Sequence, residues 1–188
     1  MAASPSPVAI AAALATQIVC GEHISAVVTD DGDLHTFGRG DTWQLGHGDE
    51  DGQHCRAPTV VSAPQASLRG CVSRVALGAD HAMAVDTNGR LFAFGRGSFS
   101  QLGLGDTSDR ASPTLVEGEG LRGKAVVSVA CGWRFTLVAC ANGEVFSWGA
   151  GSAGQLGHPS KLRRRVPTKI EALADVVDVS AGETHAMA

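Results

Sequence analysis

The chain has 188 residues, of which 24 are glycine, 44% are hydrophobic and 18% are charged. A disordered chain would be poor in apolar residues and rich in charge, and these glycines follow no three-residue period, so both disorder and a collagen-like fold are excluded. The formal net charge of −4 argues against a protein that binds nucleic acid with its whole surface, although it is compatible with a local basic patch.

In chain order, residues 1–13 are predicted to be an N-terminal extension. The longest apolar run there, Val8–Ala15, is far shorter than the roughly 20 residues that span a bilayer. Residues 1–19 contain no Lys or Arg, so the basic start of a secretory signal is missing. The five cysteines include no Cys-x-x-Cys pair, which disfavours a disulfide framework and a zinc ribbon. We therefore expect no membrane association and a cytoplasmic or nuclear location.

Residues 14–188 are predicted to consist of repeats. Three segments, 21–46, 78–103 and 132–157, align without a gap, and a partial fourth repeat starts at residue 182. Glycine occupies the same five columns in all three complete copies. A repeat of roughly this length that holds several short strands is typical of one β-propeller blade.

Within each copy, an apolar strand is followed by a tight turn and a second strand. The turn is Asp-Gly once and Asn-Gly twice, dipeptides that favour a type I′ hairpin with positive φ at both central residues. The second strand ends in an aromatic residue before Gly-x-Gly, and Gln-Leu-Gly follows, with a leucine expected to be buried and a glutamine expected to bond loop backbone. No stretch has the 3.6-residue period of a helix. The predicted strands are 24–28, 81–85 and 135–139 before the turns, and 34–37, 91–94 and 145–148 after them.

These motifs resemble the regulator of chromosome condensation repeat. The resemblance rests on Gly-x-x-His at 78–81 and 182–185, Asn-Gly, aromatic-Gly-x-Gly, and Gln-Leu-Gly-x-Gly-Asp at 101–106. It implies an all-β fold: a β-propeller of about three and a half blades, which is an incomplete seven-bladed ring. We expect three consecutive four-stranded antiparallel blades with little helix. Because an arc leaves open edges and apolar faces, self-association or completion of the ring by another chain is also expected.

No catalytic, cofactor-binding or metal-binding residue is predicted. Gly149–Gly154 matches Gly-x-Gly-x-x-Gly, but the other copies lack the third glycine and no helix follows, so a nucleotide site is disfavoured. The seven histidines lie on different elements or in columns that other copies fill with apolar residues, and no His-x-x-x-His pair occurs. Neither a nucleophile elbow nor a recurring carboxylate pair is present. The chain is therefore not expected to be an enzyme.

Trp133 and Arg134 are predicted to form a protein-binding anchor on one face of the propeller, because Trp and Arg dominate the binding energy of interfaces. Residues 132–136 are similar to a segment that photoreceptor members of the family repeat to build a tryptophan cluster. One tryptophan makes no cluster, so photoreception is disfavoured. The alternative interpretation is a tryptophan half-buried in the face. The other copies carry Glu22-His23, Ala79-Asp80 and Glu183-Thr184 at these two columns.

A basic loop of the third copy is the second candidate site. An arginine stands near the following proline in every copy, as Arg56, Arg110 and Arg165. The additional charges of the third copy are therefore Lys161, Arg163 and Arg164. Such a loop can contact phosphate or an acidic protein patch, and the alternative is a loop that is merely solvated. The candidate residues are Lys161, Arg163, Arg164 and Arg165.

The sequence predicts a non-enzymatic β-propeller that presents inter-blade loops to protein partners. The alternative implied by the resemblance is guanine-nucleotide exchange on a Ran-like small GTPase, in which a β-hairpin inserted in the propeller contacts the nucleotide site. The spans between copies show no such extra hairpin. A third hypothesis, binding to chromatin, whether nucleic acid or nucleosome, rests on the basic loop alone.

Overall fold

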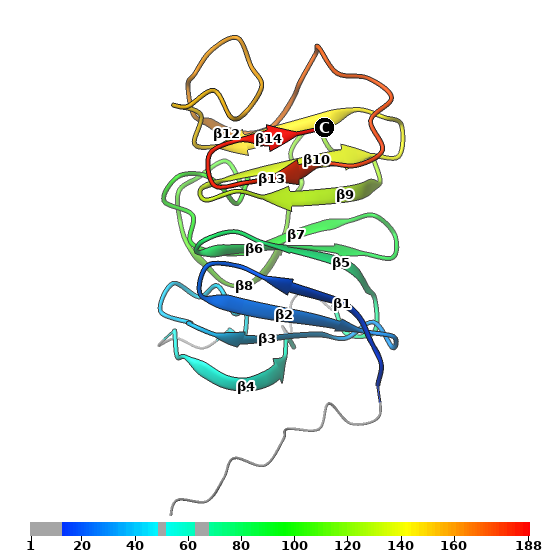
Figure 1. The fold of residues 1–188 in the computed structure, drawn as a ribbon, viewed down its shortest axis with the longest axis vertical. Coiled ribbons are helices and arrows are strands. Elements are labelled where there is room, and N and C mark those ends of the chain that lie inside the picture. Colours follow the sequence, from blue (N-terminus) through cyan, green and yellow to red (C-terminus); the bar gives the residue numbers. More distant parts are fainter. Residues whose placement is uncertain (1–12, 49–51, 63–67) are drawn as a thin grey trace, which may run out of the picture.

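A computed structural model describes residues 13–48, 52–62 and 68–188. These residues form three four-stranded antiparallel sheets and one two-stranded sheet, with no helix among them (Figure 1). In the same residues, nothing helical is present that could cross a membrane. The expected all-β fold and its three complete blades are therefore confirmed.

Each blade follows the order of the chain. The first blade consists of β1 (Ala15–Cys20), β2 (Ile24–Thr29), β3 (Leu34–Gly38) and β4 (Cys55–Val60). The second consists of β5 (Val72–Leu77), β6 (His81–Asp86), β7 (Leu91–Gly95) and β8 (Arg110–Leu115). The third consists of β9 (Val126–Cys131), β10 (Phe135–Cys140), β11 (Val145–Gly149) and β12 (Arg164–Lys169). A half blade follows, made of β13 (Ser180–Ala181) and β14 (Ala186–Met187).

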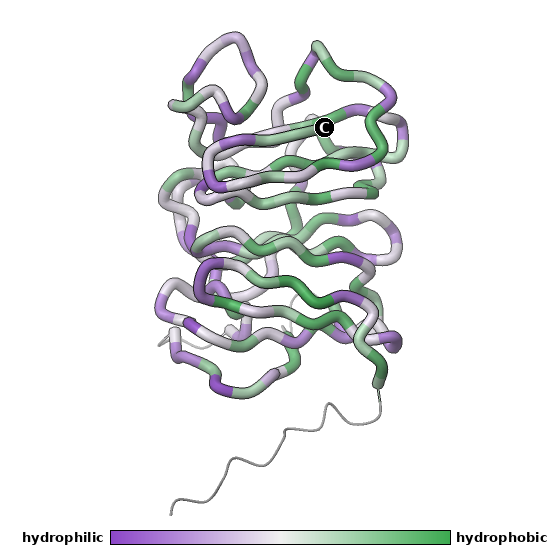
Figure 2. Tube along the Cα trace, in the orientation of Figure 1, coloured by the Kyte–Doolittle hydropathy of each residue, from purple (hydrophilic) through white to green (hydrophobic). Residues whose placement is uncertain are grey.

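The blades stack face to face. The first strand of each blade lies beside the first strand of the next, so that β1, β5, β9 and β13 form a series (Figure 1). The stack runs from the blue first blade to the red half blade and does not close into a ring. Apolar residues follow the strands, whereas hydrophilic residues gather at the turns (Figure 2). We expect this distribution, because both faces of an inner blade are covered by its neighbours while its turns remain at the surface.

Three apolar layers, one at each junction, make up the core. Large side chains of the following blade fill the first two layers, with Phe94 in the first and Trp148 in the second. In the third layer, Phe135 and Leu137 of the third blade pack toward Val179 of the half blade. The hydrophobic effect of these layers therefore acts between blades, and each blade depends on its neighbours.

The hairpin turns lie where the sequence places them, but their type differs from the prediction. Gly32, Gly89 and Gly143 have φ of 80°, 77° and 79°, whereas the residues before them do not have positive φ. The N–H of Thr29 donates to the carbonyl of Asp33, and the N–H of Gly32 donates to that of Thr29. This is a three-residue loop, a type I turn followed by a left-handed glycine, rather than a type I′ turn.

Contact with the next blade supplies a second reason for these glycines. A Cβ on Gly32 would lie 2.6 Å from the backbone of Gly70, and one on Gly89 would lie 2.7 Å from Ala125. The carbonyl of Gly89 also accepts the N–H of Val126 at the start of β9. The turn is therefore part of the blade junction, and a side chain at this column would force the blades apart.

The Gln-Leu-Gly motif behaves as predicted. Leu45, Leu102 and Leu156 are buried. The glutamine side chains accept loop N–H groups, for example Gln101 Oε1 from Phe99 at 2.8 Å. The third glycine of the Gly-x-Gly-x-x-Gly match is also explained, because Gly154 shares with Trp43 and Ser100 a column where φ is 83°, 57° and 62°. Glycine relieves backbone strain there.

Residues 1–12, nearly all of the predicted N-terminal extension, lie outside the described residues. The first described strand, β1, begins at Ala15. We keep the division into an extension at 1–13 and a propeller segment at 14–188 as a proposal.

Candidate protein-binding face

The candidate residues lie at one end of the blades, which we call the loop face. It is formed by the turns between the first and second strands and by the loops that follow the third strands. In each blade, backbone bonds join these two segments: Arg39 N–H donates to His23, Arg96 N–H to Asp80, and Ala150 N–H to Arg134. The repeat therefore places equivalent side chains of successive blades side by side on this face.

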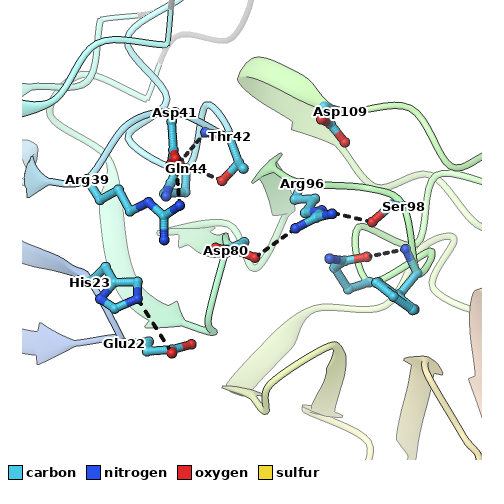
Figure 3. Close-up of polar contacts among 12 residues, drawn as sticks. Glu22, His23, Arg39, Asp41, Thr42, Gln44, Asp80, Arg96, Ser98 and Asp109 are labelled. Carbon is cyan, nitrogen blue, oxygen red and sulfur yellow. Dashed lines mark hydrogen bonds and ion pairs between the residues drawn. The ribbon is translucent and has the colours of Figure 1, made fainter.

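In the first two blades, Arg39 and Arg96 of the loop face are paired with carboxylates. Arg39 contacts Asp41 at 2.6 Å, and its hydrogen bond lowers the pKa of that carboxyl. Arg96 contacts Asp80 at 3.3 Å and also donates to Ser98. Asp80 lies between the two arginines (Figure 3). Positive charge in this part of the face is therefore largely compensated.

In the third blade, Arg134 has aromatic partners instead. Its guanidinium carbon lies 3.8 Å from the ring centre of Trp133 and 4.0 Å from that of Phe99, a residue of the second blade. Both distances are well within the range of cation–π attraction. The backbone N–H of Trp133 donates to the backbone carbonyl of Glu183, which anchors this residue to the half blade. Trp133 remains 39% exposed, so this cation–aromatic stack reaches the surface.

The basic loop approaches the same stack. Arg163 Nη1 donates to the carbonyl of Ser98 at 3.2 Å, and Ser98 is the chain neighbour of Phe99. The carbonyl of Arg165 accepts the N–H of Gly105, which ties this end of the loop to the second blade. The structure therefore brings together two candidate sites that the sequence analysis treated separately.

The other two basic residues lie differently. Lys161 is exposed, and no hydrogen bond or ion pair of its side chain is present in the part of the chain that the structure describes. Arg164 lies in β12 opposite Gly149, and its Nε is buried without a hydrogen-bond partner among the described atoms. Arg164 is therefore less available to a partner than its neighbours.

The register corrects one step of the sequence analysis. Arg110 lies opposite Gly95, and Arg164 lies opposite Gly149, so these two arginines are equivalent. Both stand three residues before a proline, whereas Arg56 and Arg165 stand two before one. By the same register Cys55 lies opposite Gly38, so Arg165 is the counterpart of Arg56, and the Lys and Arg residues that the third copy adds to both other copies are Lys161 and Arg163.

Sequence reasoning missed Phe99 and the paired arginines. The repeated Gly-Arg-Gly of Arg39 and Arg96 was a signal that could have identified the latter. Phe99 carried no such signal, because its column holds Thr42 and Ala153 in the other copies. Its role depends on a contact across a blade junction.

His81 has a structural role in the core. His81 is fully buried, and its Nε2 lies 3.0 Å from Thr136 Oγ1. Because that hydroxyl donates to the carbonyl of Gln101, the imidazole must donate through Nε2. Desolvation lowers the pKa of His81 to about 3, so the ring is neutral at physiological pH. Across the described ranges, no group of three or more His, Cys, Asp or Glu residues is arranged to hold a metal ion.

Sequence comparison identifies the repeats. The profile of the regulator of chromosome condensation (RCC1) repeat matches residues 31–85, 88–139 and 142–188. The chain belongs to this family. The RCC1 fold expected from the motifs is thereby confirmed.

Relatives of this RCC1-repeat chain differ widely in their names. Human E3 ubiquitin-protein ligase HERC2 is 38% identical over 176 residues, which are 91% of this chain and 4% of that protein. The ultraviolet-B receptor UVR8 of Arabidopsis thaliana is 36% identical over 174 residues, 92% of this chain and 38% of the receptor.

Solved structures agree with the fold. Prp20p of Saccharomyces cerevisiae superposes with a TM-score of 0.78 at 23% identity, over 92% of this chain and 42% of that one. Human WBSCR16 superposes with a TM-score of 0.72 at 29% identity, over 84% of this chain and 38% of that one. The RCC1-repeat chain thus spans less than half the length of each of these four relatives.

Proposed function

We propose that this RCC1-repeat chain is a non-enzymatic protein-interaction module of the cytoplasm or nucleus, and that the loop face of its third blade binds an acidic segment of a protein partner. One observation carries the proposal. Arg39 and Arg96 in the first two blades contact carboxylates, whereas Arg134, Lys161, Arg163 and Arg165 contact none among the described residues. A chain of net charge −4 therefore presents a local excess of positive charge.

Apolar side chains accompany these cations. Trp133 is partly exposed in the cation–aromatic stack, and Leu162 and Val166 of the basic loop are 70% and 44% exposed. Aromatic and arginine side chains form the energetic centre of protein interfaces, and complementary charge accelerates association and selects partners. A partner segment with carboxylates around an apolar residue fits this surface.

Preorganisation also supports a binding role. The planar guanidinium of Arg134 contacts two aromatic rings, and Arg163 is held by a backbone carbonyl of the neighbouring blade. Less conformational entropy is lost when such side chains bind than when free ones do. The loops therefore present their charges in a defined geometry on a rigid sheet scaffold.

The experiment uses a fluorescein-labelled peptide of ten glutamates with one central leucine, followed by anisotropy. The chain is compared with the double variant Arg163→Glu/Arg165→Glu and with the matched control Arg74→Glu/Arg122→Glu, which changes the same charge away from the loop face. We expect saturable binding that the loop variant weakens at least tenfold and the control changes less than threefold. Absence of saturable binding, or equal losses in both variants, would refute the proposal.

Nucleic acid is the competing ligand for a basic loop. A labelled 20-base-pair duplex is titrated in parallel at two salt concentrations, because phosphate contacts give a steep salt dependence. We expect weaker binding of the duplex than of the acidic peptide at physiological salt. The reverse order would reassign the site to chromatin.

Nucleotide exchange on a Ran-like GTPase is the alternative function. Every strand among the described residues belongs to one of the three blades or to the half blade, so these residues include no additional inserted hairpin. We expect no acceleration of fluorescent-nucleotide release from a Ran-type GTPase by this chain. Acceleration of tenfold or more would establish the alternative.

A further inference from the structure

The junction between the first and second blades holds a carboxylate at the end opposite the loop face. Asp33 directly follows the hairpin glycine Gly32, and the turn Leu68-Arg69-Gly70 precedes the next blade. Oδ1 of Asp33 accepts hydrogen bonds from Arg69 Nε and from the backbone N–H of Gly70, both at 2.9 Å. An arginine and a glycine N–H of one turn therefore bind one carboxylate oxygen.

The junction between the second and third blades repeats this turn without the carboxylate. Leu121-Arg122-Gly123 has the same sequence, its glycine also has positive φ, and the next N–H again donates to the carbonyl of the leucine. The residue after the hairpin glycine, however, is Arg90 in place of Asp33. Neither the side chain of Arg122 nor the N–H of Gly123 has a hydrogen-bond partner among the described residues.

A second cation thus replaces the anion of the first junction. Arg90 donates through Nε to Asp86, a buried carboxylate of its own hairpin, at 2.6 Å. The two Nη groups of Arg90 have no hydrogen-bond partner in the part of the chain that the structure describes. Because a guanidinium only donates, these groups and Arg122 require an acceptor from water or from another molecule.

Both arginines line one cavity of about 650 Å³, which we call the arginine pocket. Two residues separate Gly123 from β9, whereas one residue separates Gly70 from β5. A Cβ on Gly32 would lie 2.6 Å from the glycine of the turn, whereas the atom nearest to a Cβ on Gly89 belongs to Ala125. The longer connection therefore holds the turn away from the hairpin, and the arginine pocket lies between them.

The other walls of the arginine pocket limit which anion fits. Leu91, Val116 and Leu121 line it with apolar groups, and a cavity of this size is typical of sites for small molecules. Glu117 and Glu119 line it as well, and neither forms an ion pair among the described residues. These two carboxylates repel a polyanion, whereas an anion of single charge with an apolar body matches both the arginines and the apolar walls.

We propose that the arginine pocket binds a small monocarboxylate with an apolar body. The carboxylate takes the position that Asp33 has in the first junction and accepts hydrogen bonds from Arg122 and from the N–H of Gly123. Arg90 adds a second positive charge, and the apolar body lies against the leucines of the wall. The inference is independent of the loop-face proposal, because it uses other residues at the opposite end of the blades.

The probe is fluorophenylpropanoate, titrated with the intact chain and followed by fluorine NMR. The neutral amide of the same acid and the unlabelled ten-glutamate peptide are the comparisons. We expect saturable binding of the acid, at least tenfold weaker binding of the amide, and no displacement of the acid by the peptide. Equal binding of acid and amide, or no saturable binding of the acid, overturns the proposal. Displacement by the peptide also overturns it, since the pocket would then accept an acidic protein segment.

Variants of the chain locate the site. Arg122→Gln removes the cation of the turn, and Arg90→Asp restores the carboxylate that the first junction has at this column; each should weaken binding of the acid at least tenfold. Arg69→Gln is the matched control, because it makes the same change where Asp33 already occupies the turn, and it should change binding less than threefold.

Thermal melts verify that each variant folds. If Arg90→Asp does not fold, Arg122→Gln and its control decide the outcome, because both side chains lie at the surface. Equal affinity of these two variants for the acid overturns the proposal.

Discussion

The guanidinium carbon of Arg134 lies 4.0 Å from the centre of the Phe99 ring, although the two residues belong to different blades. The ring centre of Trp133 lies 3.8 Å from the same guanidinium carbon. The contact joins the first turn of the third blade to a loop of the second. The position of the Arg134 charge on the loop face therefore depends on how the second and third blades pack.

This coupling is measurable. In a double-mutant cycle on unfolding free energy, Phe99→Ala and Arg134→Ala should show an interaction of about 0.5–2 kcal/mol, the range for partly desolvated cation–π pairs. Chemical denaturation supplies the free energies. Arg134→Ala combined with Leu162→Ala is the control and should be additive within about 0.5 kcal/mol. An interaction near zero for the first pair would show that the stack adds nothing to stability.

Gly103 tests the contact between the glycine of Gln-Leu-Gly and the aromatic residue of the next blade, here Trp148. Gly103→Ala combines a φ of 73° with a Cβ 2.6 Å from Trp148. We expect a loss of roughly 2–5 kcal/mol, the sum of left-handed backbone strain and overpacking. Gly154→Ala is the control, because its φ is 83° but a Cβ would meet nothing within 4 Å. It should lose only about 1–2 kcal/mol. Similar melting temperatures for the two variants would show that the close contact between Gly103 and Trp148 does not matter for stability.

His81 should make the protein sensitive to mild acid. Burial lowers its pKa to about 3, whereas in the unfolded chain it stays near 6.5. Between these pH values the unfolded state binds the extra proton, so stability is complete above pH 6.5 and falls as the pH is lowered toward 3. The slope approaches about 1.4 kcal/mol per pH unit.

The variant His81→Phe tests this origin, because Phe135 occupies the same column in the third copy. Unfolding free energies from pH 3.5 to 7.5 should lose most of their slope in the variant. An unchanged slope would assign the acid sensitivity to other groups.

Glu144, at the end of the third blade opposite the loop face, should make stability depend on pH in a lower range than His81 does. It contacts Lys124 at 2.6 Å and Lys169 at 2.9 Å. Hydrogen bonds from Lys124, Lys169 and Asn142 lower the pKa of Glu144 to about 2. Its contribution to stability is therefore present above about pH 4.5 and is lost as the pH falls toward 2. Glu144→Gln should flatten the stability profile only in this window, whereas Glu171→Gln should change it little.

The repeat columns explain why most of the fold could be predicted from the sequence. Gly89 and Gly143 meet a local requirement, because the backbone at each hairpin turn has positive φ. The glycine recurs because the backbone of each blade has the same conformation at this turn. Strand positions and the burial of Leu102 and Gln101 follow from the same repetition. The turn type was predicted wrongly because Asn-Gly is compatible with both a two-residue and a three-residue loop, and loop length depends on how the strands pair.

The sequence by itself determined the blade, its glycines and the candidate side chains Trp133, Arg134 and Arg163. Only the tertiary structure decided which of them meet. Arg134 contacts Phe99, and Arg163 contacts Ser98, across a junction between residues 35 and 65 positions apart in the chain. Such contacts depend on how one blade stacks on the next, and stacking is set by apolar layers that are similar at every junction. The periodic pattern therefore specifies the stack, while the chemistry at its loop face comes from residues that depart from the pattern.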